Sequence, residues 1–437
     1  MENVEVAILG GGVAGLSAAK TARDAGLQAT VFEAEAAPGG LLANFEVDGF
    51  RFDHAVHLSF ATEPEVRAVF DQTEYITHKP EPMCWDEGHW LRHPIQNNMH
   101  PLSTDERVSM ISGLVSREDR EVENYGDWLL YQYGQPIAER WPMRYTRKYW
   151  RCEADKLGID WIGNRMRRPQ LEEVLRGAFQ NDDTNTYYVK EMRYPAQGGY
   201  FEFIKPLLQG CDLRCDHRAT AIDMDARKIT FANGQVIKFR QLLATIPLPD
   251  LVGIIADVPA TITTAVKTLM ATHIDLISVG FSRPDVSPYL WFYIYDEDIE
   301  AARAYSPSIK SPCNAPAGKS SMQFEIYSHP NDEPANRDPD YLKENTVKAL
   351  SRMGLCDPED ICLLHHKHVP HGNVIFDLGM EERRDTVREW LMEKGIHLAG
   401  RFGEWAYLWS NQAFMSGHDA ALNLQGKAKS PNSGARR

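Results

Sequence analysis

The sequence predicts an α/β fold with a parallel sheet, and three neighbouring segments carry this prediction. Residues 4–9 are an apolar run of the kind that forms a buried parallel strand. A Gly-rich turn follows, and then residues 13–25, which are rich in Ala and Leu and predict a helix that Gly26 ends. Residues 29–33 predict a second strand. The order strand, turn, helix, strand fits a βαβ crossover.

The rest of the chain alternates between strand and helix patterns. Asp48-Gly49 within residues 45–60 and Asn233-Gly234 within residues 210–245 predict hairpin turns. Residues 306–321 are rich in Pro, Ser and Ala and predict a long loop. The other expected elements are a helical stretch at residues 104–179, a strand at 289–295, an amphipathic helix at 381–394, a strand at 395–400 and a closing helix at 410–424.

The composition limits the classes of protein to which the chain can belong. It has 437 residues, 43% of them hydrophobic, which favours a globular fold over disorder. With 47 Lys and Arg against 61 Asp and Glu, its net charge of −14 argues against nonspecific binding to nucleic acid. We expect no membrane span and no signal peptide, and therefore a cytoplasmic protein. The 7 cysteines are an odd number, which favours structural thiols in a reducing compartment.

A Gly-rich motif between the first strand and the first helix predicts a dinucleotide site. Gly10, Gly12 and Gly15 have the spacing that gives a tight turn, backbone approach to a pyrophosphate and close helix packing. The motif runs into the helix start at Val13 and Ala14, where backbone N–H groups favour phosphate. Glu33 ends the second strand, where a carboxylate accepts hydrogen bonds from the hydroxyls of an adenosine ribose. An acid at this position disfavours NADP.

Two further segments specify FAD as the cofactor. Ala34 and the turn Gly39-Gly40-Leu41 follow Glu33, and this arrangement resembles the FAD signature of glutathione-reductase-type proteins. Far downstream, Gly400-Arg401 end a strand at residues 395–400 and resemble the second FAD element of such proteins. Both ends of the chain are therefore expected to contribute to one FAD site in a Rossmann-like domain.

Several motifs, in order, resemble those of the UDP-galactopyranose mutases. The most discriminating is Tyr145-Thr146-Arg147-Lys148-Tyr149-Trp150, which is similar to the Tyr-Thr-Arg-Lys-x-Trp element of these enzymes. The likeness extends over residues 4–424. The FAD elements within it belong to the wider amine oxidase and protoporphyrinogen oxidase superfamily. The other similar segments are residues 52–57, which resemble a histidine loop, residues 93–97, residues 162–165, residues 194–200 and residues 400–407.

The resemblance implies roles for individual residues. In the mutases, N5 of the reduced flavin attacks the anomeric carbon of the sugar and expels the nucleoside diphosphate. By resemblance, Arg165 would bind the diphosphate, Tyr145 and Tyr407 would donate hydrogen bonds to phosphate, and Trp150 would bound the sugar. The resemblance also implies that His57 lies beside the flavin, that Tyr407 contacts it, and that Asn97 contacts the substrate. His57, Arg165 and Tyr407 are the catalytic candidates. A reductant such as NAD(P)H would dock transiently.

The sequence departs from the mutase pattern in two places. Trp409 occupies the position of an Asp in the mutases, and Ala55-Val56 replace the residues Gly-Pro or Gly-Gly before the loop histidine. These departures favour an alternative function, an FAD-dependent oxidoreductase of the amine oxidase or protoporphyrinogen oxidase type. A third hypothesis is an FAD-bearing fold that binds a partner without turnover.

Two interpretations exist for the four histidines of one short segment: a metal site, or a strand with a structural role. They are His365, His366, His368 and His371. Imidazoles are common zinc ligands, but the spacing fits no standard motif. On a strand, His366 and His368 would share one face and His365 would point away. We therefore predict a pocket-edge strand and no metal.

The predicted elements group into three domains. We expect a discontinuous FAD-binding domain from residues 1–72, 196–248 and 376–426. Residues 100–182 are expected to be a mainly helical insertion. Residues 250–375, together with residues 75–98, are expected to be a mixed-sheet substrate domain. Residues 427–437 are small, polar and basic, and we expect a disordered tail.

Overall fold

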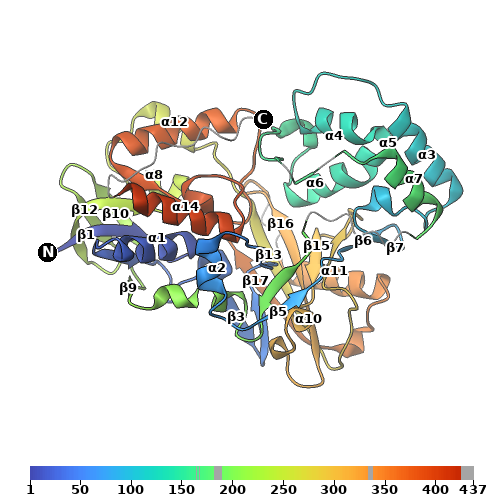
Figure 1. Cartoon of the computed structure of the whole chain (residues 1–437), viewed down its shortest axis with the longest axis horizontal. Coiled ribbons are helices and arrows are strands. Elements are labelled where there is room, and N and C mark those ends of the chain that lie inside the picture. Colours follow the sequence, from blue (N-terminus) through green and yellow to red (C-terminus); the bar gives the residue numbers. More distant parts are fainter. Residues whose placement is uncertain (164, 167, 182–188, 333–337, 425–437) are drawn as a thin grey trace.

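A computed structural model describes residues 1–163, 165–166, 168–181, 189–332 and 338–424. The predicted tail at residues 427–437 lies outside these ranges. Two seven-stranded sheets form the body of the protein, and a group of helices extends from it at one end (Figure 1). The mixture of parallel and antiparallel strands with helices confirms the predicted α/β class.

The first sheet contains the predicted βαβ unit. Its strands lie in the order β10-β11-β12-β1-β2-β9, and β18 pairs with β12. The pairs β1–β2, β1–β12 and β12–β18 are parallel, whereas β11 pairs with β12 in the antiparallel direction. The strands are β1 (Glu2–Leu9), β2 (Ala29–Phe32), β9 (Asp212–Arg214), β10 (Ala219–Asp223), β11 (Lys228–Phe231), β12 (Val236–Ala244) and β18 (Ile396–Leu398).

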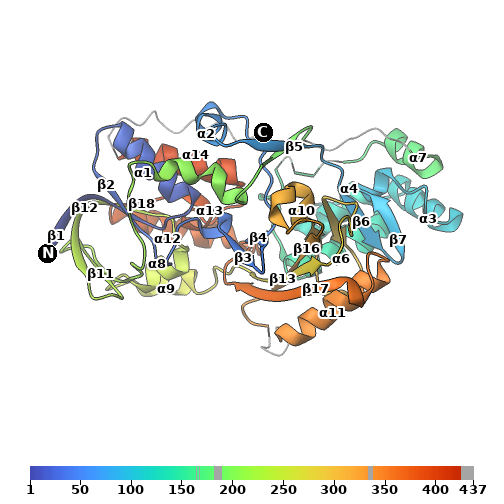
Figure 2. The same ribbon diagram turned by 90° about the horizontal axis from the view of Figure 1, so that it is seen from below.

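Helices cover both faces of this first sheet because β1 is apolar on both sides. Val6 and Ile8 pack with Ala residues of α1 (Val13–Asp24) and α14 (Ser410–Asn423). Ala7 and Leu9, on the other face of β1, lie in one cluster with residues of α8 (Leu248–Gly253), α9 (Ala260–Val266) and α12 (Met380–Glu393). Figure 2 shows these two helical layers on either side of the strands. The period of two in β1 produces this three-layer packing.

The second sheet is mixed and lies beside the first. Its strands have the order β17-β13-β16-β15-β14-β6-β7, and α11 (Pro339–Arg352) packs on β13 and β17. The histidine segment forms a strand, as predicted, and this strand, β17, lies at the edge of the sheet. That it borders a pocket stays a prediction. The strands are β6 (Met83–Asp86), β7 (His89–Arg92), β13 (His273–Phe281), β14 (Trp291–Ile294), β15 (Arg303–Tyr305), β16 (Ser320–Ser328) and β17 (Ile361–Val369).

The helical region predicted at residues 104–179 is present as several short helices. A capping box at Ser103 and Glu106 begins the first of them. The elements are α3 (Thr104–Val115), α4 (Tyr125–Tyr133), α5 (Gln135–Ala138), a π-helical turn (Glu139–Met143), α6 (Arg144–Tyr149) and α7 (Leu171–Phe179). Pro142 lies within the π-helical turn, where it interrupts the regular helix hydrogen bonds.

Two small two-stranded sheets and three further helices complete the fold. β3 (Asn44–Val47) and β4 (Phe50–Asp53) form the hairpin predicted at Asp48-Gly49. The hairpin predicted at Asn233-Gly234 joins β11 to β12. The remaining elements are β5 (Tyr75–His78), which pairs with β8 (Met192–Pro195), and the helices α2 (Pro64–Phe70), α10 (Pro307–Lys310) and α13 (Gly400–Gly403). No helix among the described residues combines the length and hydrophobicity that crossing a membrane requires.

The predicted loop at residues 306–321 is wrong in part. The segment contains α10 and the start of β16, and several of its polar side chains are fully buried. Lys310, Ser311 and Asn314 each have 0% of their surface exposed. Polar and Pro-rich composition predicts an exposed loop, but here Lys310 Nζ, Ser311 Oγ and Asn314 Nδ2 each donate a hydrogen bond within the protein.

Candidate functional site

The Gly-rich turn after β1 holds the carboxylate of Glu33 in a fixed position. Backbone N–H groups of Gly11 and Glu35 donate to the two carboxylate oxygens, at 2.6 and 2.9 Å. Glu33 is 9% exposed. A Cβ at Gly11 would come within 2.9 Å of that carboxylate, so the close approach requires glycine. The carboxylate is thus oriented at the end of β2, as binding of an adenosine ribose requires.

The second Gly turn packs directly against the first. The N–H of Gly39 donates to the Gly11 carbonyl at 2.9 Å, and Gly39 forms a bridge with Gly12. A Cβ at Gly15 would lie 2.0 Å from the carbonyl oxygen of Gly10, whereas a Cβ at Gly12 would meet nothing within 4 Å. Space is therefore left at Gly12, at the start of α1. Val13 and Ala14 are buried in the first turn of that helix. These turns fit the pyrophosphate of a dinucleotide.

The carboxyl-terminal motif reaches the same turn from the other end of the chain. β18 runs parallel to β12 and delivers Gly400 to the start of α13. Gly400 has φ +79°, and a Cβ there would lie 2.7 Å from Cβ of Ala14. Its N–H donates to Ser416 Oγ on α14 at 2.7 Å. The two ends of the chain therefore meet at the Gly-rich turn.

His57 is held beside the second Gly turn by its ring nitrogen. Nε2 lies 2.8 Å from the carbonyl of Leu41 and 3.1 Å from that of His54, so Nε2 carries the proton and donates. The ring lies against Tyr200, with centroids 5.2 Å apart. Burial lowers the pKa of His57, because a buried imidazole favours the neutral form. His57 thus presents a neutral imidazole at the edge of the predicted cofactor site.

Arg165 meets the carboxyl-terminal motif across 242 residues of sequence. Its Nη2 donates to the Tyr407 carbonyl at 2.6 Å, and Nη1 donates to the Trp161 carbonyl at 2.8 Å. The guanidinium lies 4.6 Å from the ring centroids of Tyr407 and Trp409. Trp409, which replaces the Asp of the mutase pattern, is therefore a stacking partner of Arg165.

Two more arginines lie beside Tyr407 and its hydrogen-bonded neighbour Tyr149. The guanidinium of Arg401 lies 4.7 Å from the ring of Tyr407, and that of Arg303 lies 5.5 Å from the ring of Tyr149. The hydroxyl groups of Tyr149 and Tyr407 are hydrogen-bonded at 3.0 Å. Three cationic groups from three distant segments thus surround one tyrosine pair.

Tyr145 and Trp150 lie in the aromatic cluster around this pair. Tyr145 stacks on Tyr149 at 5.3 Å, and burial raises the pKa of its hydroxyl. Trp150 is 3% exposed and contacts Tyr407 and Phe376. Both residues therefore lie with the Tyr149–Tyr407 pair, with Trp150 inside the packed core. Their proposed contacts with substrate stay predictions.

Asn97 packs against helix α7. Its Nδ2 donates to Glu173 at 3.3 Å. A Cβ added at Gly177 of α7 would lie 1.7 Å from the backbone carbonyl oxygen of Asn97, so the two segments are in close contact. Asn97 is 7% exposed. The contacts of Asn97 thus connect it to the helical region.

Two ion pairs beside the histidine loop were not predicted from the sequence. Lys310 Nζ contacts Asp53 at 2.9 Å, and Arg303 Nε donates to Glu325 on β16. Glu325 Oε1 also accepts the backbone N–H of Val56 at 2.6 Å. Asp53 belongs to the histidine loop, but its partner Lys310 lies in residues 306–321, whose composition predicted a loop. No local pattern in the sequence links Lys310 to this site.

The histidine segment forms a hydrogen-bonded cluster on β17. His366 Nε2 and His368 Nδ1 lie 2.7 and 3.0 Å from the same oxygen of Asp275. His365 instead contacts Phe45, with ring centroids 5.4 Å apart, so the predicted alternation of faces is confirmed. Among the residues that the structure describes, no group of three His, Cys, Asp or Glu side chains is arranged to hold a metal.

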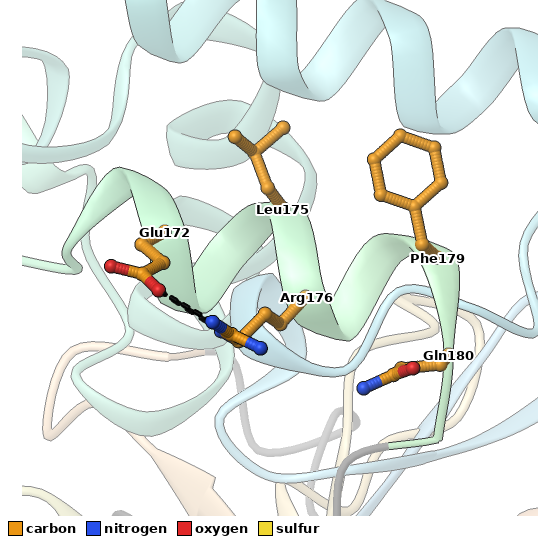
Figure 3. Close-up of a pocket in the computed structure, with 5 residues that line it drawn as sticks. All are labelled: Glu172, Leu175, Arg176, Phe179 and Gln180. Atoms are coloured by element: carbon orange, nitrogen blue, oxygen red, sulfur yellow. Dashed lines mark hydrogen bonds and ion pairs between the residues drawn. The ribbon is translucent and has the colours of Figure 1, made fainter.

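Two surface cavities lie away from the predicted site residues. One, of about 280 Å³, lies along α7, where Leu175 and Phe179 point away from the ion pair of Glu172 and Arg176 (Figure 3). The other, of about 450 Å³, lies among β5, β6, β7 and α10. Neither is lined by a residue of the two Gly turns or of the Tyr149–Tyr407 pair. The lining residues of the second are His78, Lys79, Glu81, Met83, Arg92, Pro288, Tyr289, Leu290 and Ile309.

Comparison with known proteins identifies one family over nearly the whole chain. The model of the flavin containing amine oxidoreductases matches residues 13–424. A curated relative, protoporphyrinogen oxidase 2, chloroplastic/mitochondrial, of Arabidopsis thaliana, is 39% identical over 66 residues. That match spans 15% of this chain and only 13% of the relative's length.

Solved structures of several flavoproteins have the same fold. A reduced UDP-galactopyranose mutase matches with a TM-score of 0.90 and 24% identity, over 98% of this chain and 96% of the mutase. A structure described as a protoporphyrinogen oxidase of Exiguobacterium sp. 255-15 matches with a TM-score of 0.74 and 16% identity, over 97% and 99% of the two chains. At these identities the likeness shows the fold.

Proposed function

The chain belongs to the flavin containing amine oxidoreductases, and on that premise we propose that it acts on a nucleotide-activated sugar or a similar glycan precursor. As a member of this family it is a flavoenzyme that uses FAD. The two Gly turns, the oriented Glu33 carboxylate and the Gly400 turn fit this cofactor. When bound, reduced FAD supplies a nucleophilic N5 atom, and oxidised FAD accepts a hydride.

The convergence of Arg165, Arg401 and Arg303 on the Tyr149–Tyr407 pair carries the proposal. A leaving nucleoside diphosphate requires cations that bind its oxygens and stabilise its charge. Guanidinium groups do this well because their paired donors match phosphate oxygens. The chain has a net charge of −14, so the guanidinium groups of Arg165 and Arg401 beside the Tyr407 ring are a local concentration of cations. Arg303 beside Tyr149 is paired with Glu325. We propose that Arg165 binds the diphosphate and that Tyr407 and Tyr145 lie beside it.

The remaining predicted residues have proposed roles around this diphosphate site. We propose that the neutral imidazole of His57 borders the flavin, and that Trp150 supports the wall next to the sugar. Gly10, Gly12, Gly15, Gly39, Gly40 and Leu41 would form the cradle of the FAD pyrophosphate. Asn97 would need to approach substrate from the helical region. A transient NAD(P)H or another donor would reduce the flavin.

Nucleotide binding to the reduced holoprotein tests this proposal. We expect UDP or dTDP, and their sugars, to change the fluorescence of the dithionite-reduced flavin. Arg165→Ala is expected to raise the Kd for the nucleotide by about 10–100-fold, because a charge-assisted hydrogen bond contributes about 1.5–3 kcal/mol.

Arg168→Ala is the matched control for Arg165→Ala. Arg168 lies three positions along the chain and also covers a tyrosine ring, that of Tyr131, at 4.4 Å, but it does not contact the Tyr149–Tyr407 pair. We expect its Kd to stay within twofold of wild type at equal FAD content. If no nucleotide changes the reduced flavin of the wild-type protein, the proposal is wrong.

A redox function is the second candidate, because the family model is that of amine oxidoreductases and the match of 39% identity is to a protoporphyrinogen oxidase. In this alternative FAD takes a hydride from a C–N or C–C centre of a small molecule. Anaerobic bleaching of the oxidised flavin by amines or by a reduced porphyrin, followed by hydrogen peroxide release in air, would support it. Nucleotide binding without bleaching would favour the first candidate.

A further inference from the structure

The loop that carries His57 borders the proposed FAD site, and contacts with the rest of the protein must fix its backbone. The loop starts at Asp53, the last residue of β4, and His57 donates to Leu41 of the second Gly turn at 2.8 Å. Ala55 in this loop has φ +80°, a conformation that L-residues rarely adopt. A backbone with this strain persists only where the surrounding structure fixes it. The contacts of the loop with the rest of the protein therefore decide its position.

Asp53 anchors the beginning of this loop, and its carboxylate is fully used. One oxygen accepts from Lys310 Nζ at 2.9 Å and from the Tyr194 hydroxyl at 2.8 Å, and the other accepts the N–H of Tyr200 at 3.0 Å. Asp53 is 1% exposed. Burial raises its pKa, but the Lys310 ammonium and the Tyr200 N–H outweigh this and lower the pKa overall. Asp53 is thus ionised in the interior.

Lys310 belongs to the part of the chain that packs on the second sheet. It ends α10, which packs on β16 of the second sheet, and it is 0% exposed. Its ammonium lies 3.9 Å from the ring centroid of Tyr305 and 4.7 Å from that of Tyr194. Burial lowers the pKa of Lys310, while Asp53 acts in the opposite direction. The pair therefore joins the hairpin near the Gly turns to the second sheet.

A buried ion pair of this kind contributes little to net stability. The desolvation of two charges costs several kcal/mol per ion, and apolar replacements are often neutral or stabilising. An apolar pair, however, lacks the directional contacts that fix the Tyr200 N–H, the Tyr194 hydroxyl and the loop backbone. We propose that Lys310 is a positioning residue that, through Asp53, holds residues 53–57 and the His57 imidazole in place against FAD. This inference concerns the FAD site and does not depend on the proposed substrate.

The double variant Lys310→Met with Asp53→Asn tests the proposal, because it removes both charges and leaves no unpaired ion. Asn keeps an oxygen acceptor for one of the donors. We expect this variant to fold, to bind FAD about 10-fold more weakly and to show a shifted visible spectrum and midpoint potential of the bound flavin. FAD binding is measured by titration of the apoprotein, and the spectrum and potential on the substrate-free holoprotein.

Lys148→Met is the matched control for this experiment. Lys148 is also buried, at 5% exposure, and its Nζ donates to the carbonyls of Ile294 and Asp296 at 2.9 and 2.7 Å. It does not contact the histidine loop. We expect this control to lower the Tm and to leave the flavin spectrum and potential unchanged. The proposal is overturned if the double variant has the FAD affinity, spectrum and potential of wild type, or if Lys148→Met changes them equally.

Discussion

Ala55 combines a buried side chain with a positive φ angle, and it lies between the anchored Asp53 and the ring of His57. Its carbonyl accepts a hydrogen bond from the Tyr305 hydroxyl at 3.3 Å, and its N–H donates to the Asp53 carbonyl at 3.0 Å. These contacts hold the strained residue from both sides. The conformation is the one that Gly adopts readily, and the mutase pattern has Gly near this position. A side chain larger than a methyl group is therefore not expected to fit here.

Substitutions at Ala55 measure this strain. We expect Ala55→Val to lower the free energy of unfolding by about 2–3 kcal/mol, because a β-branched residue is disfavoured at positive φ. Ala55→Gly is expected to stay within about 1 kcal/mol of wild type, since the relief of strain offsets the added flexibility of Gly. Urea unfolding provides the measurement. Ala43→Val is the control, because Ala43 has φ −65° and ψ 162°. Equal losses in Ala55→Val and Ala43→Val would contradict the strain.

At the scale of elements, helices α1 and α14 cross at very close range over the first sheet. A Cβ at Gly417 would lie 2.0 Å from the carbonyl oxygen of Ala14. The same crossing places Ser416 where its hydroxyl accepts the N–H of Gly400. One small residue thus sets the distance between the helix that begins the fold and the helix that ends it, and it aligns the two FAD elements.

Gly417→Ala is expected to separate these helices. The added methyl group cannot fit without backbone movement, so we expect the free energy of unfolding to fall by about 2–3 kcal/mol. The FAD content after purification should fall with it. Gly253→Ala is the control, because Gly253 in α8 has no atom within 4 Å of its Cβ position and should gain up to about 1 kcal/mol. A Gly417→Ala protein with wild-type Tm and FAD content would show that the crossing relaxes freely.

At the scale of the whole molecule, the proposed FAD site is assembled from segments that are far apart in sequence. β1 pairs with β12, β12 pairs with β18, and α14 packs on α1, so the two ends of the chain close one cradle. Residues on the second sheet then support the histidine loop through Lys310 and Glu325. Binding of FAD therefore couples both ends of the chain.

Hydrogen exchange with and without FAD measures this coupling. A ligand that binds only the folded state stabilises the elements that it contacts. We expect removal of FAD to raise exchange in residues 10–41 and also in residues 396–417, while the centre of the second sheet, β13 and β16, changes less. Mass spectrometry of peptic peptides gives the comparison. Changes confined to the amino-terminal segment would contradict a site made by both ends.

Much of this architecture is predictable from local patterns. The buried strand β1, the hairpins at Asp48-Gly49 and Asn233-Gly234, and the helix ending before Gly26 follow from a continuous apolar run and from turn chemistry. The fold class and FAD can be predicted from such local signals, because the glycines of the cradle are recognised by their spacing and by the strand and helix on either side of them. The structure of residues 306–321 cannot be predicted in this way, because its polar residues are buried by partners that lie elsewhere in the chain.

The sequence by itself determined the α/β class and FAD as the cofactor, while the FAD site at the joined ends of the chain and the roles of Arg165 and His57 stay predictions. Only the tertiary structure decided that Arg165 stacks between Tyr407 and Trp409, that Trp150 lies in the core, and that Lys310 pairs with Asp53. The physical reason is the range of the interactions. Turns, caps and strand periodicity act over a few residues, whereas ion pairs and ring contacts depend on distances that exist only after the two sheets have packed.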